Sequence, residues 1–402
     1  MSTHQASDIT IYVALPVMDE ELVVNRCLEA IQKQTYHNFK LFACVNQPES
    51  WWNNTLKVEV CHANARVMAI LREAGAHVID RTSRGKGWQG KDMGVGWARK
   101  VIMDEINTVA SPSDIIVSTD ADTVFGEHYF NSIIQLFKKH PDRMALSNPY
   151  YHCLTGGDDL DRALLRYEIY MRCYALNLWH IGSPYTFTAL GSAIALPVSA
   201  YRKIGGMTPK KSGEDFYFLQ KLRKAGKILT WNAEKVYPAT RYSDRVFFGT
   251  GPALIKGQKG DWESYPIYHR CLFEDIRQTY ELFGLLFNKD VDTPLDSFIH
   301  NQLNEKNIWT SLRNNTKTAG SFVAACHQKI DGLRILQFLK WKNDTLKISD
   351  EEALKDFFDY FYKEEVSFNI ENLSFISSSI QQLDKVRNFL AMKELEWQYK
   401  DL

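Results

Sequence analysis

The stretch that decides the fold is residues 115–122, IIVSTDAD, in which an apolar, β-type run leads directly into two aspartates. Because side chains alternate between the two faces of an extended chain, we expect Asp120 and Asp122 to point the same way. Adjacent carboxylates repel each other unless a cation lies between them, and a divalent cation carrying a diphosphate suits this role. Two further Asp-x-Asp triplets, at 159–161 and 290–292, do not end an apolar strand. The context of Asp120 and Asp122 therefore predicts a metal and phosphate site.

Around this stretch, short apolar strands alternate with amphipathic helices. We predict strands at 9–15, 39–45, 77–80 and 115–119, with Pro16 ending the first. The 3.6-residue period predicts helices at 20–33, 58–74 and 93–105. This alternation predicts an α/β fold with a mostly parallel sheet and helices on both faces. In such sheets, ligands bind outside the carboxyl ends of the strands.

The pattern changes towards the end of the chain. Strand, helix and strand are predicted at 192–197, 212–225 and 228–232. From about residue 268 the segments are periodic and charge-laced, which predicts helices at 273–287, 319–339, 351–362 and 377–396. We therefore predict one sheet-containing domain over 1–265 and a helical C-terminal region over 266–402.

Composition excludes several classes of function. Lys plus Arg equals Asp plus Glu, at 48 each, so no bulk positive field favours nucleic acid. The seven cysteines are scattered without a Cys-x-x-Cys pair, which predicts a reducing compartment, the cytoplasm. Residues 1–8 lack a signal pattern, and the longest weakly polar run, 186–198, is too short to span a bilayer. Peripheral membrane contact stays open.

A glycine-rich segment at 84–92, RGKGWQGKD, resembles two nucleotide-binding patterns and satisfies neither in context. It fits G-x-G-x-x-G but follows the third strand, and no acidic strand end lies about twenty residues later to bind a ribose. It nearly fits a P-loop, yet Asp92 replaces the required hydroxyl residue. We expect a loop in which Lys86 and backbone amides approach a phosphate or ribose, with a solvated basic turn as the alternative.

The segment 212–215, SGED, opens the helix predicted at 212–225. Ser212 suits a helix cap, and acids in a first helical turn gain about 0.3–1 kcal/mol from the helix dipole. The alternative is catalytic, because a carboxylate fixed at a helix start can accept a proton from a hydroxyl group. We expect the dipole to keep such a carboxylate ionised, as a general base requires. Residue types alone leave both interpretations open.

Taken together, these motifs resemble the family 2 glycosyltransferases, inverting enzymes of GT-A (Rossmann-like) fold that use nucleotide-diphospho-sugars. The resemblance covers roughly the first 255 residues, and its motifs occur in the family's order. They are IYVALPVMDEE at 11–21, RGKG at 84–87 with Gly94 and Trp97-Ala98, TDAD at 119–122, GSAIAL at 191–196 with Gly205-Gly206, and GED at 213–215.

The resemblance implies how the donor is bound. Pro16 and Asp19 would line the nucleobase pocket, and Asp120 would approach the ribose. Asp122, with Asp120 beside it, would hold Mn²⁺ or Mg²⁺ against the diphosphate. The family usually has one or two aspartates after the second strand, where this chain has Asn46, whose amide can still bond a base edge.

The resemblance also implies the chemistry. Asp215 would be the catalytic base, with Glu214 beside it. Lys86 would neutralise the leaving diphosphate, and Arg245 or Ser243 would contact the phosphates.

The implied function is metal-dependent, inverting transfer of a sugar to a hydroxyl acceptor, which is a glycan, a lipid-linked molecule or a small molecule. The Gln-x-x-Arg-Trp element of the family's processive synthases is missing, which favours transfer of one sugar at a time. Two alternatives are a P-loop or nucleotidyl-transfer enzyme and a non-catalytic nucleotide-sugar-binding module.

Overall fold

The computed structural model describes residues 9–90, 93–210, 213–243 and 249–402. The chain forms two compact units. The sheet unit comprises Met1–Leu160, Phe187–Lys259 and Gln398–Leu402. The helical unit comprises Asp161–Thr186 and Gly260–Trp397. The helical unit thus includes a segment from the middle of the chain, Asp161–Thr186, so no single boundary separates the two units. The predicted domain boundary after residue 265 stays a proposal.

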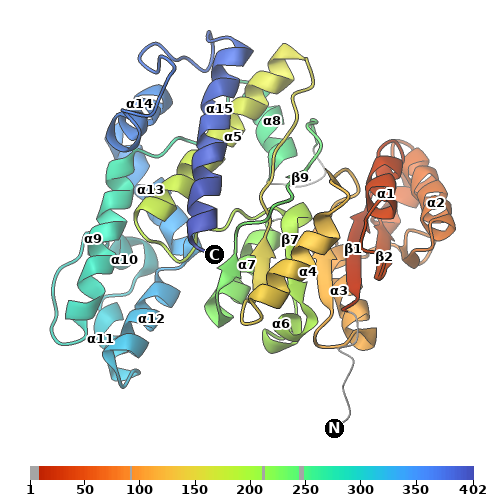
Figure 1. Ribbon diagram of the computed structural model, residues 1–402, viewed down its shortest axis with the longest axis horizontal. Coiled ribbons are helices and arrows are strands. Elements are labelled where there is room, and N and C mark those ends of the chain that lie inside the picture. The colour runs from red at the N-terminus through yellow and green to blue at the C-terminus, as the bar shows by residue number, and fades with distance from the viewer. Residues whose placement is uncertain (1–8, 91–92, 211–212, 244–248) are drawn as a thin grey trace. The chain divides into compact units, whose positions relative to one another are not determined.

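Within the described residues, seven strands form the main sheet in the order β3-β2-β1-β4-β7-β6-β8 (Figure 1). The pairs β1–β2, β1–β4, β2–β3 and β6–β8 are parallel, whereas β7 runs antiparallel to β4 and β6. Strands β5 and β9 form a separate antiparallel pair. The α/β class with a mostly parallel sheet is confirmed. The strands are β1 Ile11–Val17, β2 Phe39–Asn46, β3 His77–Arg81, β4 Ile115–Ser118, β5 Val124–Phe125, β6 Ala145–Ser147, β7 Ile194–Pro197, β8 Ile228–Leu229 and β9 Val236–Tyr237.

Strand β1 is buried along its whole length and does not end at Pro16, as the sequence predicted, but at Val17. The carbonyl of Ala14 accepts the Thr119 N–H, so Ala14 and, two residues on, Pro16 face β4. The last β1–β4 pair is Ala14 with Ser118, so Pro16 lies beyond the end of that ladder. Its missing N–H therefore removes no hydrogen bond from the sheet.

Helices flank this sheet, with α2 packed on β2 and β3 and α3 packed on β1 and β2. Helix α3 begins two residues later than predicted, because Gly94 takes a positive φ of 109° at its start. The α-helices along this part of the chain are α1 Val24–Gln32, α2 Val58–Glu73, α3 Val95–Val109, α4 Tyr129–Lys139, α6 Val198–Lys203, α7 Glu214–Ala225 and α8 Thr250–Gln258.

The helical unit is built from amphipathic helices, as predicted from the charge-laced pattern. The single helix expected over 319–339 is in fact two, because Asp331 caps a new helix by accepting the Arg334 N–H at 3.1 Å. No helix within the described ranges is long and apolar enough to cross a membrane. The helices are α5 Asp158–His180, α9 Arg270–Leu286, α10 Asp296–Leu303, α11 Ile308–Asn314, α12 Ala319–Lys329, α13 Gly332–Leu346, α14 Asp350–Phe361 and α15 Ile380–Lys400.

A buried network of charges joins α5 and α15, which run side by side (Figure 1). Glu168 on α5 lies 3.0 Å from Arg387 and 3.6 Å from Arg172. Arg172 in turn donates to Glu394 over 2.7 Å. All four side chains are almost fully buried. Ionised groups tolerate such burial only when they are paired, so this network fixes how the two helices meet.

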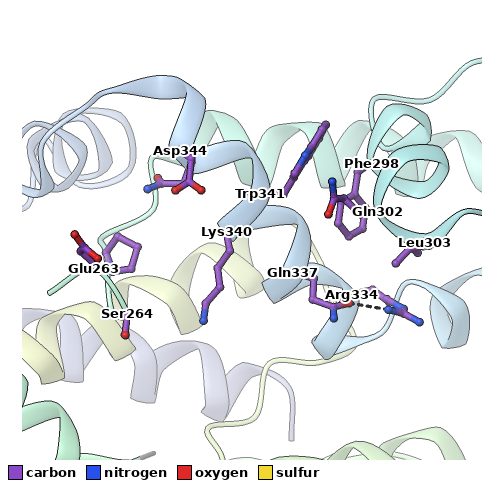
Figure 2. A pocket seen from close by; sticks show the side chains of 12 residues that line it. Glu263, Ser264, Phe298, Gln302, Leu303, Arg334, Gln337, Lys340, Trp341 and Asp344 are labelled. Atoms are coloured by element: carbon purple, nitrogen blue, oxygen red, sulfur yellow. Dashed lines mark hydrogen bonds between the residues drawn. The ribbon is translucent and has the colours of Figure 1, made fainter.

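The helical unit also contains a cavity of about 950 Å³ (Figure 2). Phe298 and Trp341 contribute aromatic rings to its wall, and Arg334 bonds Gln337 there over 2.7 Å. Its lining includes acidic as well as basic side chains and several amides. This mixture selects no single class of ligand.

We predict that Glu168→Gln lowers the free energy of unfolding by about 1–3 kcal/mol, because it removes the carboxylate that Arg172 and Arg387 share, while Glu394 and Asp384 still pair with the two arginines. Urea unfolding followed by circular dichroism measures this. Arg277→Gln is the control, since Arg277 pairs with Glu274 and Glu281 at an exposed position and should change the free energy of unfolding much less. Equal effects of the two changes would contradict the role given to the buried network.

Candidate active site

The two aspartates after β4 lie in a turn rather than in an extended strand. The carbonyl of Asp120 accepts the Thr123 N–H at 3.0 Å, which closes the turn immediately after the strand. The expected alternation of side chains therefore does not apply. Asp120 pairs with Arg99, and Asp122 pairs with Arg241. The site thus consists of two arginine-centred clusters.

Arg99 on α3 is the centre of the first cluster, with its side chain only 2% exposed. Its guanidinium donates to the Asp120 carboxylate over 2.9 Å and to the Gly191 carbonyl over 2.9 Å. It also bonds the Ser118 hydroxyl. Its Nε lies 3.4 Å from Glu214 Oε1. One buried side chain therefore connects the end of β4, the segment before β7 and the start of α7.

Two glycines permit this arrangement. A Cβ on Gly191 would lie 2.3 Å from the Arg99 guanidinium, and one on Gly96 would lie 2.2 Å from the Lys210 carbonyl. Neither contact is sterically possible, and the buried Arg99 has no space into which to withdraw. Glycine at these two positions lets α3 approach both neighbouring segments closely.

Arg241 is the centre of the second cluster. It donates to Glu20 over 2.6 and 2.8 Å, and its Nε donates to Asp122 over 3.0 Å. The pairing of Val124 with Tyr237 in the β5–β9 ladder places the chain before β5 beside the chain after β9. That short ladder therefore sets Asp122 within reach of Arg241.

The buried thiol of Cys27 shows that the acidic groups of both clusters gather at one place. Burial raises the pKa of Cys27, and the nearby carboxylates of Asp122, Asp120 and Glu20 raise it further. The thiol lies 3.6 Å from the Asp120 carbonyl. Three carboxylates therefore lie close enough to influence one side chain at the end of the sheet.

Glu214 and Asp215 form a second acidic pair at the start of α7. Burial raises the pKa of Glu214 to about 7, and the charge of Asp215 contributes to this rise. Burial also raises the pKa of Asp215, although the Phe216 N–H and Arg99 oppose the rise. Loss of hydration therefore works against ionisation of Asp215, while the Phe216 N–H and Arg99 favour it, and the ionised state that a general base requires stays a prediction. A carboxylate whose pKa is raised towards neutrality is well suited to accept a proton.

The predicted nucleobase residues lie around the carboxyl ends of β1 and β2. Pro16 is buried in β1, whereas Asp19 is exposed with a positive φ of 59°. Asn46 is 2% exposed, and its amide already bonds the Val17 carbonyl at 2.9 Å and the Trp88 indole at 3.0 Å. These bonds give Asn46 a structural role at the strand end. Its contact with a base edge stays a prediction, as do those of Pro16 and Asp19.

Acidic side chains of neighbouring segments bond the glycine-rich loop. The Glu49 carboxylate accepts the N–H groups of Gly85 and Gly87, each over 2.8 Å. Lys86 bonds Asp80 over 3.0 Å while its side chain stays 61% exposed. The backbone N–H groups of Gly85 and Gly87 therefore donate to Glu49, whereas the sequence led us to expect that they approach a phosphate or ribose. Lys86 remains accessible for the predicted contact. The predicted phosphate residue Arg245, together with Ser212 and Asp92, lies outside the described residues.

The donor atoms of the site fit a hard divalent cation. Asp120 and Asp122 offer carboxylate oxygens with side chains 35% and 17% exposed. Within the described ranges, no group of three or more His, Cys, Asp or Glu side chains is arranged to hold a metal alone. Magnesium-like ions are commonly held by one or two carboxylates together with substrate phosphates. Asp122 and Asp120 therefore match the carboxylate ligands of such a site, and a diphosphate would supply the phosphate ligands.

Two site residues, Arg99 and Arg241, were not singled out from the sequence, and Glu20 lies in the motif at 11–21 without having been given a role. Arg99 did leave a signal, since it occupies a helix face otherwise made of apolar residues such as Ile102 and Ile106. An arginine in an apolar stripe implies a buried carboxylate partner. Asp122 and Arg241 meet through the β5–β9 ladder, whose strands of two residues each are too short to show a pattern.

The chain matches the family described as "Glycosyltransferase like family 2" over residues 8–230. This match covers more than half of the chain, so the protein belongs to that family and is a glycosyltransferase. The mostly parallel sheet with flanking helices is the α/β architecture that the sequence predicted. Family membership displaces the alternatives of a P-loop enzyme and a non-catalytic module.

Solved structures with a similar fold include TarS 1-349 of S. aureus in complex with UDP-GlcNAc. It is 12% identical, with 98% of this chain and 92% of that chain covered and a TM-score of 0.39. Glucosyl-3-phosphoglycerate synthase from Mycobacterium tuberculosis, in complex with Mn²⁺, UDP and glucosyl-3-phosphoglycerate, is 11% identical. That likeness covers 63% of this chain and 81% of that chain, with a TM-score of 0.36. The comparison with curated proteins found no match.

We predict that Glu214→Gln stabilises the protein increasingly as pH rises from 4.5 to 7. A carboxyl group whose pKa is about 7 when folded and 4.5 otherwise binds its proton more tightly in the folded state, so the parent loses stability across this window. The glutamine variant avoids that loss, which amounts to at most about 3 kcal/mol. Urea unfolding at several pH values measures the difference.

The control for this experiment is Glu29→Gln, which removes a charge from an exposed helix position. A difference between Glu214→Gln and the parent that stays constant between pH 4.5 and 7 would contradict the raised pKa of Glu214.

Proposed function

We propose that this glycosyltransferase moves a sugar from a nucleotide-diphospho-sugar to a hydroxyl acceptor, with inversion at the anomeric carbon and one sugar per encounter. The observation that carries this proposal is the shared guanidinium of Arg99. It bonds Asp120, the proposed ribose contact, and lies 3.4 Å from Glu214, the neighbour of the proposed base Asp215. One buried side chain, Arg99, therefore positions both the proposed ribose contact and the neighbour of the proposed base.

On the donor side, Pro16, Asp19 and Asn46 would border the base, and Asp120 would bond the ribose. Asp122 would hold Mn²⁺ or Mg²⁺. When bound, the cation would neutralise the charge that develops on the departing diphosphate.

Two basic residues would contact the diphosphate. Lys86, exposed on the glycine-rich loop, would contact the phosphates, and Arg245 would do so from the segment after β9.

On the acceptor side, Asp215 would take the proton of the attacking hydroxyl group. The acceptor oxygen forms a new bond to the anomeric carbon while the bond from that carbon to the β-phosphate oxygen breaks. The bonding electrons leave with the nucleoside diphosphate. Because attack and departure lie on opposite faces, the anomeric configuration inverts. Glu214 lies beside Asp215, and burial raises the pKa of both carboxyl groups, which would make the pair a better proton acceptor.

The acceptor would be a glycan, a lipid-linked molecule or a small hydroxyl compound. A peripheral contact with a membrane is compatible with a lipid-linked acceptor. We propose a cytoplasmic location from the odd number and the scatter of the cysteines.

We predict that Asp215→Asn abolishes transfer while nucleotide binding stays nearly intact, because the base acts on the acceptor. The first measurement is thermal shift with UDP, GDP, CDP and ATP, each with and without Mn²⁺. The second is release of the nucleoside diphosphate from matching sugar nucleotides when hydroxyl acceptors are added. We expect a loss of transfer of about 10²-fold or more, as removal of a general base typically causes.

Asp142→Asn is the matched control, since Asp142 is exposed in the same unit. Equal loss of nucleotide binding and transfer in Asp215→Asn would contradict the base assignment. Stabilisation by ATP in preference to UDP, GDP and CDP would contradict a sugar-nucleotide donor.

A further inference from the structure

The carboxylate proposed to hold the metal is already bound to a cation of the chain itself. Arg241 donates to Asp122 through both Nε and Nη2, and both bonds end on Oδ2. The same Nη2 bonds both oxygens of Glu20. The side chains of Glu20 and Asp122 are 8% and 17% exposed. Arg241 therefore contributes to the neutralisation of both of these nearly buried carboxylates.

A divalent cation on Asp122 conflicts with this arrangement. Two positive groups on one carboxylate repel each other, and the repulsion is strong where the surroundings are poorly hydrated. The excess positive charge becomes favourable only when a diphosphate arrives, which brings several negative oxygens. The site is therefore built to prefer metal and diphosphate together over metal alone.

Arg241 is placed to move, whereas Arg99 is not. The side chain of Arg241 is 29% exposed, and residues 238–243 lie outside helices and strands. Arg99 is 2% exposed, lies within α3 and bonds the Ser118 hydroxyl and the Gly191 carbonyl as well as Asp120. Burial restricts Arg99 to one conformation, and this constraint is weaker for Arg241, whose side chain is 29% exposed.

We propose that Arg241 is an exchangeable counter-ion of the donor site. It neutralises Asp122 and Glu20 in the nucleotide-free enzyme. When the metal and the nucleoside diphosphate enter, it releases Asp122 to the metal, keeps Glu20 as its anchor and donates to the phosphate oxygens. A guanidinium suits this exchange because its N–H groups match carboxylate and phosphate equally well. The inference rests on the proposed donor site, and it adds an order to binding, in which the metal binds tightly only together with the diphosphate.

The first test is a titration of the nucleotide-free enzyme with Mn²⁺ alone, with electron paramagnetic resonance measuring free Mn²⁺. We expect Arg241→Gln to bind Mn²⁺ about tenfold more tightly than the parent or better, because a competing charge is gone. Arg241→Lys should stay close to the parent, since it keeps the charge. Adding Asp122→Asn to Arg241→Gln should remove the gain.

Arg66→Gln is the matched control. Arg66 also joins two carboxylates, those of Glu21 and Glu59, but its side chain is 51% exposed and its partners lie outside the site. We expect Arg66→Gln to leave Mn²⁺ affinity unchanged. Mn²⁺ binding to Arg241→Gln that is no tighter than to the parent would overturn the inference.

A second measurement does not depend on a variant that folds. The Mn²⁺ affinity of the parent is compared with and without UDP, and then with and without GDP. The inference predicts at least about tenfold tighter Mn²⁺ binding with one of the two nucleotides. Equal affinity in all conditions would overturn it. Coupled Mn²⁺ and nucleotide binding without any sugar transfer would support the inference while contradicting the proposed function, so the two can fail separately.

Discussion

The buried guanidinium of Arg99 is the interaction on which the rest of the site depends. Its single charge holds a carboxylate from the loop after β4, the start of α7 and the backbone before β7. Burying an arginine is tolerable only when carboxylates and carbonyls surround it, and the acidic residues at this point satisfy that condition. Those same residues carry the proposed chemistry. Stability and function therefore use the same contacts, and the helix that supplies Arg99 must approach closely, which glycine at positions 96 and 191 permits.

The two arginines have different electrostatic roles. Arg99 is buried and holds its bonding partners in fixed positions, which preorganises the site. Arg241, at the surface, balances the acidic groups of the other cluster and is exchangeable. Burial has a further consequence on the acceptor side, because it raises the pKa values of Glu214 and Asp215. Poor hydration of this acidic pair works against ionisation, while the Phe216 N–H and Arg99 favour the ionised form of Asp215.

Much of the fold could be predicted from periodicity, because β1, β2 and β4 are nearly continuous apolar runs and the helices between them have apolar faces. The errors have local causes. Pro16 was expected to end a strand, but it lies beyond the last pairing with β4. The aspartates at 120 and 122 were expected on one face, but a turn at Asp120–Thr123 separates their directions. Site residues that belong to motifs were found in the sequence. Arg241 was not singled out, because it reaches Asp122 through β5 and β9, which are two residues each.

The most direct test is the nucleotide affinity and transfer rate of Arg99→Lys. Lysine keeps the buried charge, so we expect cooperative unfolding, but one ammonium group cannot bond Asp120, Ser118 and the Gly191 carbonyl while lying beside Glu214. Nucleotide affinity and transfer should therefore fall together, each by about tenfold or more. Arg202→Lys, which loses bonds to Asn107 and Ala110 away from the site, should change neither. Full nucleotide affinity and transfer in a folded Arg99→Lys variant would contradict the account.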